Sequence, residues 1–478
     1  MASNPEGRKL VLGIDIGTTS IKVCIVDVCT REVLSKQSKD TQANVPSDLG
    51  SEGNKQDVPK IISALNFCIS RLPKDQLREV KQIGICGQMH GVMLWHQTDE
   101  INAWTTVELG GAQSGGANGY RFEVENDKVS SLYTWQDSRC DPAFLSTLPE
   151  PQSHIQICSG YGCATLFWFA KHKQEKLVRF NRVGTVQDFA VAMLCNLKKP
   201  VMSVQNAALW GYFDVRTSQW NFDILSQAGF PSELLPEVLQ TGENAGILSE
   251  QWYAIPSGTP IGVALGDLPC SVLAALERPS DAIMNISTSA QMAFVMPSSY
   301  EPSSNCQENH SIIYFPYFSG RYLAVAAALN GGNALATFVK TLQQWTLELG
   351  CSVPQAKIWD RVLALAAEES SVSSLQIVPT LLGERHIPIQ NASVSNIDLG
   401  NLGLGQVFRA LCHGIVKNLY SMMPREMLLE SSIDRILGLG SALTRNKVLQ
   451  MEVKNLYQLP VDIVSGGDAA MGAALSVV

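Results

Sequence analysis

Two short runs of small hydroxyl residues could bind phosphate groups. They are Gly17, Thr18, Thr19 and Ser20 near the start of the chain, and Ser287, Thr288 and Ser289 beyond its middle. Each run follows one apolar strand pattern and precedes another, so each is predicted to form the tip of a hairpin. Such tips expose backbone N–H groups and hydroxyl donors, which a polyphosphate accepts. Two such hairpins in one chain indicate two similar domains that face one nucleotide.

Two carboxylates follow predicted buried strands and could act on a phosphorylated ligand. Asp15 ends the strand before the first hydroxyl run, where it could hold Mg²⁺ against phosphates. Asp267 follows Gly266 and the apolar segment 261–265, a position suited to a general base that faces a cleft. An isolated aspartate at such a place is more often a turn or a helix N-cap. The two phosphate hairpins favour the base.

Two further groups of side chains could contact a polyol. His90 lies in the loop 87–91 after a short strand, and its neutral imidazole could bond a substrate hydroxyl. Trp135, Asp137 and Arg139 place an aromatic face, an acceptor and a donor at alternate positions. An exposed loop histidine, and a structural aromatic beside a surface ion pair, fit the sequence equally well.

The elements that must position these residues alternate between strand and helix patterns in both halves, which predicts an α/β fold. Apolar spacing predicts helices over 58–70 and 444–457, whereas the glycine-rich segment 102–119 is expected to be a surface insertion or a flexible loop. A strand–Gly-x-Gly–helix junction at Gly438 and Gly440 would let the backbone approach an adenosine phosphate closely. The turn at 256–260 marks the expected domain boundary.

Composition narrows the class of protein. The chain has 478 residues, of which 45% are hydrophobic and 17% charged, as in ordinary globular proteins of two to three domains. Its net charge of −8 argues against non-specific nucleic-acid binding, and no apolar run is long enough to span a membrane. The 12 cysteines show no metal-binding or C-x-x-C spacing, and the first residues are polar, so a cytoplasmic location is the default expectation.

Over nearly its whole length the chain resembles the FGGY carbohydrate kinase family. Motifs that match the family occur in the family's order at residues 15–20, 87–91, 135–139, 266–267, 287–289, 330–332, 383–385, 438–441 and 468–473. The resemblance implies two actin-like (ribonuclease H-like) domains with mixed sheets flanked by helices and an active site in the cleft between them. We expect a sugar-binding domain over 1–260 and a nucleotide-binding domain over 261–478.

The resemblance also implies roles for single residues, with ATP and Mg²⁺ as cofactors. Asp267 would be the catalytic base and Asp15 the metal-binding residue. The expected substrate-binding residues are Gln88, Met89, His90, Trp135, Asp137 and Arg139. The expected nucleotide-binding residues are Gly17, Thr18, Thr19, Ser20, Ser287, Thr288, Ser289, Gly331, Gly440, Ser441 and Asn446.

The implied reaction is phosphoryl transfer from ATP to the terminal primary hydroxyl of a ketose. Overall likeness is greatest to the family members that phosphorylate sedoheptulose. A pentulose kinase acting on xylulose or ribulose is the alternative, and an actin-like ATP-binding module without catalysis is a more distant one. The expected partner is a small-molecule ketose, with no nucleic acid or membrane, and the chain could be a monomer or a homodimer.

Overall fold

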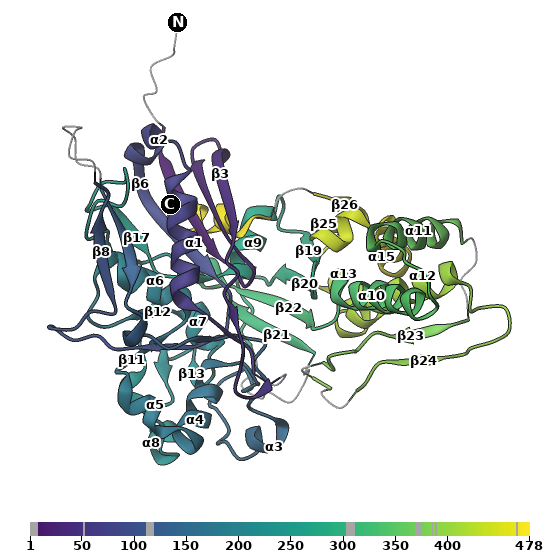
Figure 1. Cartoon of the computed structure of the whole chain (residues 1–478), viewed down its shortest axis with the longest axis horizontal. Coiled ribbons are helices and arrows are strands. Elements are labelled where there is room, and N and C mark those ends of the chain that lie inside the picture. Colours follow the sequence, from purple (N-terminus) through teal and green to yellow (C-terminus); the bar gives the residue numbers. More distant parts are fainter. Residues whose placement is uncertain are drawn as a thin grey trace, which may run out of the picture.

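The computed structural model describes residues 8–50, 53–110, 119–302, 311–369, 374–384, 386–387, 390–464 and 467–478. Two mixed β-sheets, each covered by helices, make up most of the described chain (Figure 1). The first sheet lies in the purple and blue half of Figure 1, and the strands of the second lie between it and a group of green and yellow helices. The predicted α/β class is therefore confirmed.

The first sheet is built around the hairpin that carries the first hydroxyl run. Its described strands are β1 (Leu10–Ile16), β2 (Ser20–Asp27), β3 (Glu32–Asp40), β6 (Val80–Gly87), β16 (Asn244–Ile247), β17 (Pro260–Gly262) and β18 (Leu265–Gly266). The order is β16-β17-β6-β1-β2-β3. β18 pairs with the last residues of β6, on the same side of β6 as β17. β1 runs antiparallel to β2 and parallel to β6, and every residue of β1 is buried. A strand buried on both faces explains the continuous apolar run in the sequence.

The second sheet repeats the central part of this arrangement. Its described strands are β19 (Asp281–Ile286), β20 (Ala290–Val295), β21 (Ile312–Pro316), β22 (Tyr322–Ala328), β25 (Arg435–Leu439) and β26 (Val461–Ile463). Their order is β21-β22-β20-β19-β25-β26, in which β19 is antiparallel to β20 and parallel to β25. The β19–β20 hairpin thus occupies the place that the β1–β2 hairpin has in the first sheet.

Helices cover both sheets. The longer ones are α1 (Val58–Ser70), α4 (Gly162–His172), α6 (Val186–Cys195), α9 (Asp267–Ala275), α10 (Gly332–Glu348), α11 (Gln355–Glu368), α12 (Leu404–Met422) and α15 (Lys447–Tyr457). The shorter ones are α2 (Lys74–Glu79), α3 (Pro142–Leu145), α5 (Gln174–Arg179), α7 (Val204–Ala208), α8 (Phe222–Gln227), α13 (Arg425–Glu430), α14 (Ser441–Arg445) and α16 (Ala469–Leu475). The other described strands form the three-stranded sheet β10-β5-β4 and several pairs. They are β4 (Asn44–Val45), β5 (Lys55–Gln56), β7 (Met93–Trp95), β8 (Trp104–Glu108), β9 (Tyr120–Val124), β10 (Leu132–Tyr133), β11 (Arg182–Gly184), β12 (Val201–Ser203), β13 (Phe213–Asp214), β14 (Gln219–Trp220), β15 (Glu237–Leu239), β23 (Gln376–Val378) and β24 (Ser393–Ser395).

The last helix of the chain, α16, packs on the first sheet although it follows the second one in sequence. A Cβ added at Gly13 of β1 would lie 1.8 Å from the carbonyl oxygen of Ala470, and one at Gly84 of β6 would lie 1.9 Å from that of Ala473. Glycine at these two positions therefore lets the helix backbone rest directly on the strands. In Figure 1 the yellow α16 accordingly lies behind the purple strands, beside α9.

Two sequence expectations differ from the structure. The segment 102–119 is not all loop, because Trp104–Glu108 pairs with Tyr120–Val124 as the hairpin β8–β9. Residues 111–118 lie outside the described residues. The single helix expected over 444–457 is two helices, α14 and α15, because Asn446 has an extended backbone (φ −109°, ψ 100°) and caps α15 with its side chain.

The proposed division of the chain at 260/261 falls inside β17, which hydrogen-bonds to β6 of the first sheet. It remains a proposal. Across the described part of the chain, no helix is both long enough and apolar enough to cross a membrane.

Candidate active site

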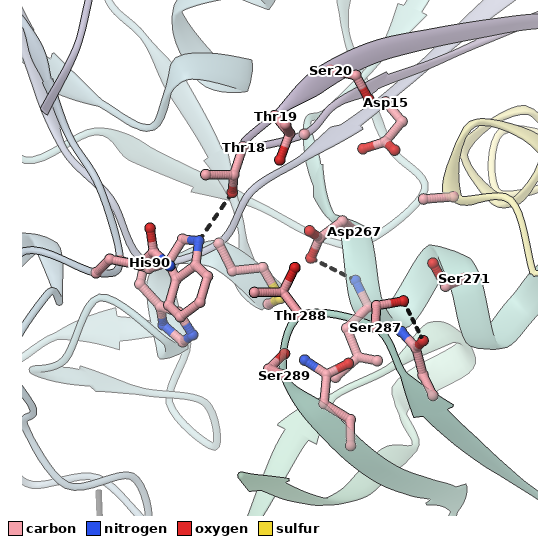
Figure 2. A pocket seen from close by; sticks show the side chains of 18 of the residues that line it. Asp15, Thr18, Thr19, Ser20, His90, Asp267, Ser271, Ser287, Thr288 and Ser289 are labelled. Carbon is pink, nitrogen blue, oxygen red and sulfur yellow. Dashed lines mark hydrogen bonds between the residues drawn. The ribbon is translucent and has the colours of Figure 1, made fainter. Parts of the chain in front are cut away.

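The two hydroxyl runs, although far apart in sequence, line one cavity. Its volume is about 590 Å³, and it is also lined by Asp15, by Asp267, and by Met89 and His90 of the loop 87–91. Figure 2 shows Asp267 between the turn of Thr18, Thr19 and Ser20 and the turn of Ser287, Thr288 and Ser289. The hairpin tips of both sheets therefore face a single space.

The position of Asp267 follows from strand register. β18 pairs with β6 so that Gly266 is opposite Gly87, and β6 pairs with β1 so that Gly87 is opposite Ile16. Parallel strands end at one edge of a sheet, so Asp267 and Asp15 emerge together. The backbone N–H of Leu268 donates to Asp267 Oδ1 at 2.7 Å, which orients the carboxylate. Burial raises the pKa of Asp267 to about 6, against the opposing effects of that hydrogen bond and of Lys22.

Asp15 is almost fully buried and could hold a cation. Its Oδ2 lies 3.6 Å from Lys22 Nζ, and its Oδ1 has no hydrogen-bond partner in the structure. Burial raises the pKa of Asp15 to about 7, and the nearby charges of Asp267 and Asp468 add to this effect. Among the described residues, no group of three or more His, Cys, Asp or Glu side chains could enclose a metal. Mg²⁺ is commonly held by one or two carboxylates together with substrate phosphates, and the lone Oδ1 fits that mode.

Both hairpin tips are tight turns. The N–H of Gly17 donates to the carbonyl of Ser20 at 3.2 Å, and the N–H of Ser287 donates to that of Ser289 at 2.9 Å. Thr19 and Thr288, which lie at the apices, are exposed. Hydroxyl groups therefore reach the cavity from opposite sides, as two-sided binding of a phosphate chain requires.

The other four expected nucleotide-binding residues do not line this cavity. Two of them press on the second tip: a Cβ at Gly331 would lie 2.5 Å from the carbonyl carbon of Ser289, and one at Gly440 would lie 2.4 Å from the carbonyl oxygen of Ile286. Ser441 is exposed at the start of α14. Asn446 is buried and accepts from the N–H groups of Val448 and Leu449, so its side chain serves as a helix cap.

Another part of the cavity wall is formed by Met89, His90 and Trp135. His90 has a left-handed backbone (φ 73°), and its ring stacks on Tyr161 with a centroid separation of 4.5 Å. A strained backbone on a packed side chain is a frequent property of functional positions. Trp135 Nε1 donates to Thr18 Oγ1 at 3.0 Å, so the indole is hydrogen-bonded directly to the tip of the first hairpin.

Gln88, Asp137 and Arg139 lie behind that wall and do not line the cavity. The Arg139 guanidinium forms a buried bidentate pair with Asp137, with distances of 2.6 and 2.8 Å, and stacks on Tyr133. Gln88 donates to Gln56 Oε1 at 3.0 Å. We therefore propose that Asp137 and Arg139 support the segment 133–139, which carries Trp135, and that Gln88 fixes the loop 87–91 to Gln56.

Several lining residues were not singled out from the sequence. They include Lys22, Gln136, Ser271, Asn285 and Gln291. Lys22 had a usable signal, because it follows the hydroxyl run on β2 and a cation there would neutralise phosphate charge. Ser271 had a weaker one: it lies four residues after Asp267, so a helix from 267 onward places both on one face.

Comparison with known proteins agrees with this geometry. Residues 10–103 and 116–274 match the model of the N-terminal domain of the FGGY family of carbohydrate kinases. The chain is 45% identical to the sedoheptulokinase of Mus musculus over 99% of this chain and 98% of the relative, and 44% identical to that of Homo sapiens over 98% and 97%.

A solved structure shows the same fold at low identity. The xylulose kinase of Rhodospirillum rubrum has a TM-score of 0.75 at 18% identity and covers 98% of this chain and 88% of its own. The expected architecture of two actin-like domains is thus confirmed. With a family model over more than half of the chain and relatives at 44–45% identity over nearly all of it, the chain belongs to the FGGY family of carbohydrate kinases.

Proposed function

We propose that this protein transfers the γ-phosphoryl group of ATP to the terminal primary hydroxyl of sedoheptulose, giving sedoheptulose 7-phosphate and ADP. The substrate is supported by the two sedoheptulokinase relatives, which match this chain over almost their entire length. The observation that carries the chemistry is the position of Asp267. It lies in one cavity with both hydroxyl turns, at the edge where β18 ends.

The reaction follows from that arrangement. Asp267 accepts the proton of the sugar hydroxyl while the oxygen of that hydroxyl forms a bond to the γ-phosphorus. The bond between the γ-phosphorus and the oxygen that remains with ADP breaks at the same time. Thr18, Thr19 and Ser20 on one side, and Ser287, Thr288 and Ser289 on the other, donate to phosphate oxygens. Because the transition state of phosphoryl transfer is loose, this positioning contributes more than the strength of the base.

Asp15 is the residue that would hold Mg²⁺. Its partnerless Oδ1 and raised pKa mark a carboxylate whose charge is poorly compensated by the protein alone. A bound cation would neutralise that carboxylate and the phosphate charge together. Lys22, 3.6 Å from Asp15 on the same side, adds a fixed positive charge beside the first turn.

The test is a panel of ketoses with five, six and seven carbons, assayed by ADP release. We expect sedoheptulose to give the highest kcat/KM, with the phosphate on the terminal carbon by phosphorus NMR. A higher kcat/KM for xylulose or ribulose would replace the proposal by a pentulose kinase. ATP binding without any sugar-stimulated ADP release would indicate a nucleotide-binding module instead.

A further inference from the structure

Two pairs of consecutive polar residues are buried behind the edge of the first sheet that faces the cavity. They come from the first turn of α6 and from the short helix α7, and they are Gln187, Asp188, Gln205 and Asn206. Each is at most 1% exposed. None lines the cavity, and the reaction as described above uses none of them.

The two residues of α7 hold the strand that ends at the base. Gln205 Oε1 accepts from the N–H of Gly266 at 3.3 Å, and Asn206 Nδ2 donates to the carbonyl of Ala264 at 3.0 Å. Gly266 immediately precedes Asp267. A shift of Gln205 would therefore move the backbone from which the carboxylate projects.

Gln187 of α6 holds the start of the loop 87–91 in the same way. Its Nε2 donates to the carbonyl of Gln88 at 3.1 Å, and a Cβ at Gly87 would lie 3.0 Å from its Oε1. Gly87 and Gly266 are paired across β6 and β18. The two glutamines thus hydrogen-bond to the neighbouring ends of β6 and β18. Gln187 bonds to the residue before Met89, and Gln205 bonds to the residue before Asp267.

The three amide side chains each keep one buried polar atom that bonds to no other described protein atom. These atoms are Gln187 Oε1, Gln205 Nε2 and Asn206 Oδ1. A buried polar group without a partner costs stability, whereas apolar side chains of the same size would fill the space without that cost. Packing alone therefore does not account for amides at these places, but the hydrogen bonds to Gly266 and Gln88 do.

We propose that Gln205 and Gln187 are positioning residues of the phosphoryl transfer: Gln205 sets the place of Asp267, and Gln187 sets the place of the loop that carries Met89 and His90. The inference rests on the proposed function. Loss of the first bond should impair the chemical step, and loss of the second should impair sugar binding, because the bonds lead to different groups.

The experiment compares Gln205→Met and Gln187→Met, which keep side-chain length and remove the amide. With the best ketose of the panel, we expect Gln205→Met to lower kcat about 10- to 100-fold with little change in ketose KM. Gln187→Met should raise ketose KM about tenfold, and the KM for ATP should stay unchanged in both.

A matched control is Gln97→Met, since Gln97 is also fully buried and bonds to the N–H of Ala103 away from the cavity. It should change neither kcat nor KM. If Gln205→Met does not fold, Gln205→Asn keeps the amide but is too short to reach Gly266, and it should show the same loss of kcat. Gln205→Glu retains an oxygen for Gly266 and should restore most of kcat.

The inference fails if the glutamine variants shift only the melting temperature and leave kcat and both KM values within about twofold of the wild type. That result is distinct from a failure of the proposed function, in which the wild-type protein itself phosphorylates no ketose.

Discussion

Asp267 joins two properties that a proton acceptor in a closed site needs. Its carboxylate is oriented by a hydrogen bond from the next backbone N–H, and its partly buried position raises its pKa to about 6. A base with this pKa is largely ionised at neutral pH, yet it binds a proton more readily than a solvated aspartate.

The substitution Asp267→Asn tests this role. Asparagine keeps the shape and an oxygen for the N–H of Leu268, so the variant should fold, but it cannot accept a proton. We expect kcat to fall about 10²–10⁴-fold. The folded-state pKa lies above the ordinary value of 3.8, so the ionised carboxylate lowers stability above about pH 6. The melting temperature of the variant at about pH 8 should therefore equal or exceed that of the wild type.

The kcat and the melting temperature of Asp267→Asn must be interpreted together. A kcat near the wild-type value would remove Asp267 from the mechanism, and a low kcat with a strongly reduced melting temperature would indicate misfolding.

The pH profile gives an independent prediction. Protonated Asp267 cannot act as a base, so log(kcat/KM) should be level above about pH 7 and fall below about pH 6, approaching tenfold per pH unit. Asp15, with a pKa of about 7 from burial, must ionise to bind a cation, so lowering free Mg²⁺ should move the acid limb upward. The measurement is kcat/KM from about pH 5 to 9 at two Mg²⁺ concentrations. A profile that stays flat down to pH 5 contradicts the assignment.

The location of a single residue at the cavity was predictable where its position in the chain alone places it there. Asp15 and Asp267 each follow a buried strand, and such positions gather at one sheet edge whatever the details of packing. Gln187 and Gln205 gave no such signal, because a glutamine in a short helix is ordinary until the strand that it contacts is known. The alternation of Asp137 and Arg139 suggested a polyol contact, and it did not reveal that the two side chains form a buried ion pair. Their contact with a substrate stays a prediction.

Among the elements, the second phosphate turn depends on the glycine that follows β25. Gly440 has a φ of 89°, and a Cβ there would lie 2.4 Å from both Asn285 Oδ1 and the carbonyl oxygen of Ile286. Asn285 in turn accepts from Ser287 Oγ at 3.2 Å. Any side chain at 440 would therefore push on the turn that is proposed to hold phosphate.

We expect Gly440→Ala to raise the KM for ATP about tenfold or more and to leave the ketose KM nearly unchanged. The control is Gly229→Ala: Gly229 has a similar φ of 70°, but nothing lies within 4 Å of its added Cβ. Both variants carry the same type of backbone strain, but only Gly440→Ala also places a side chain against the turn of residues 287–289. A difference between their KM values for ATP therefore reports the contact with the turn and not the strain. Equal effects of the two substitutions on the KM for ATP would contradict the prediction.

Element prediction succeeded where local signals agreed and failed where one residue overrode a pattern. The helix predicted over 58–70 is α1, which Asp57 caps and whose apolar stripe includes Ile61, Ile62 and Leu65. The pattern at 444–457 is equally amphipathic, but the side chain of Asn446 begins a new helix inside it. Periodicity cannot reveal that break, because it does not register competition by a capping side chain.

At the scale of the whole molecule, the cavity lies between two sheets that contribute one turn each. Both turns can contact one nucleotide at the same time only when the two sheets are close together. Binding of sugar and nucleotide should therefore favour a conformation in which the sheets lie closer to each other. Small-angle scattering should show a smaller radius of gyration with ketose and a non-hydrolysable ATP analogue than without ligands. Unchanged curves, under conditions where both ligands are shown to bind, would count against closure.

The repeated architecture was readable from the two hairpins, but the route of the chain between the halves was not. Local sequence predicts a boundary at a Pro- and Gly-rich turn, and 256–260 is such a turn. The strands after it nevertheless return to the first sheet, because β17 and β18 pair with β6, whose residues lie about 180 positions earlier in the sequence.

The packing of α16 on β1 and β6 makes the first sheet depend on a segment far along the chain. Gly13 and Gly84 lie in strands of residues 10–16 and 80–87, whereas the helix that rests on them spans Ala469–Leu475. Ala470 and Ala474 of this helix are buried against Val11 and Cys24. Removal of α16 should therefore uncover apolar side chains of β1 and β2, so the loss of order would appear more than four hundred residues before the deletion.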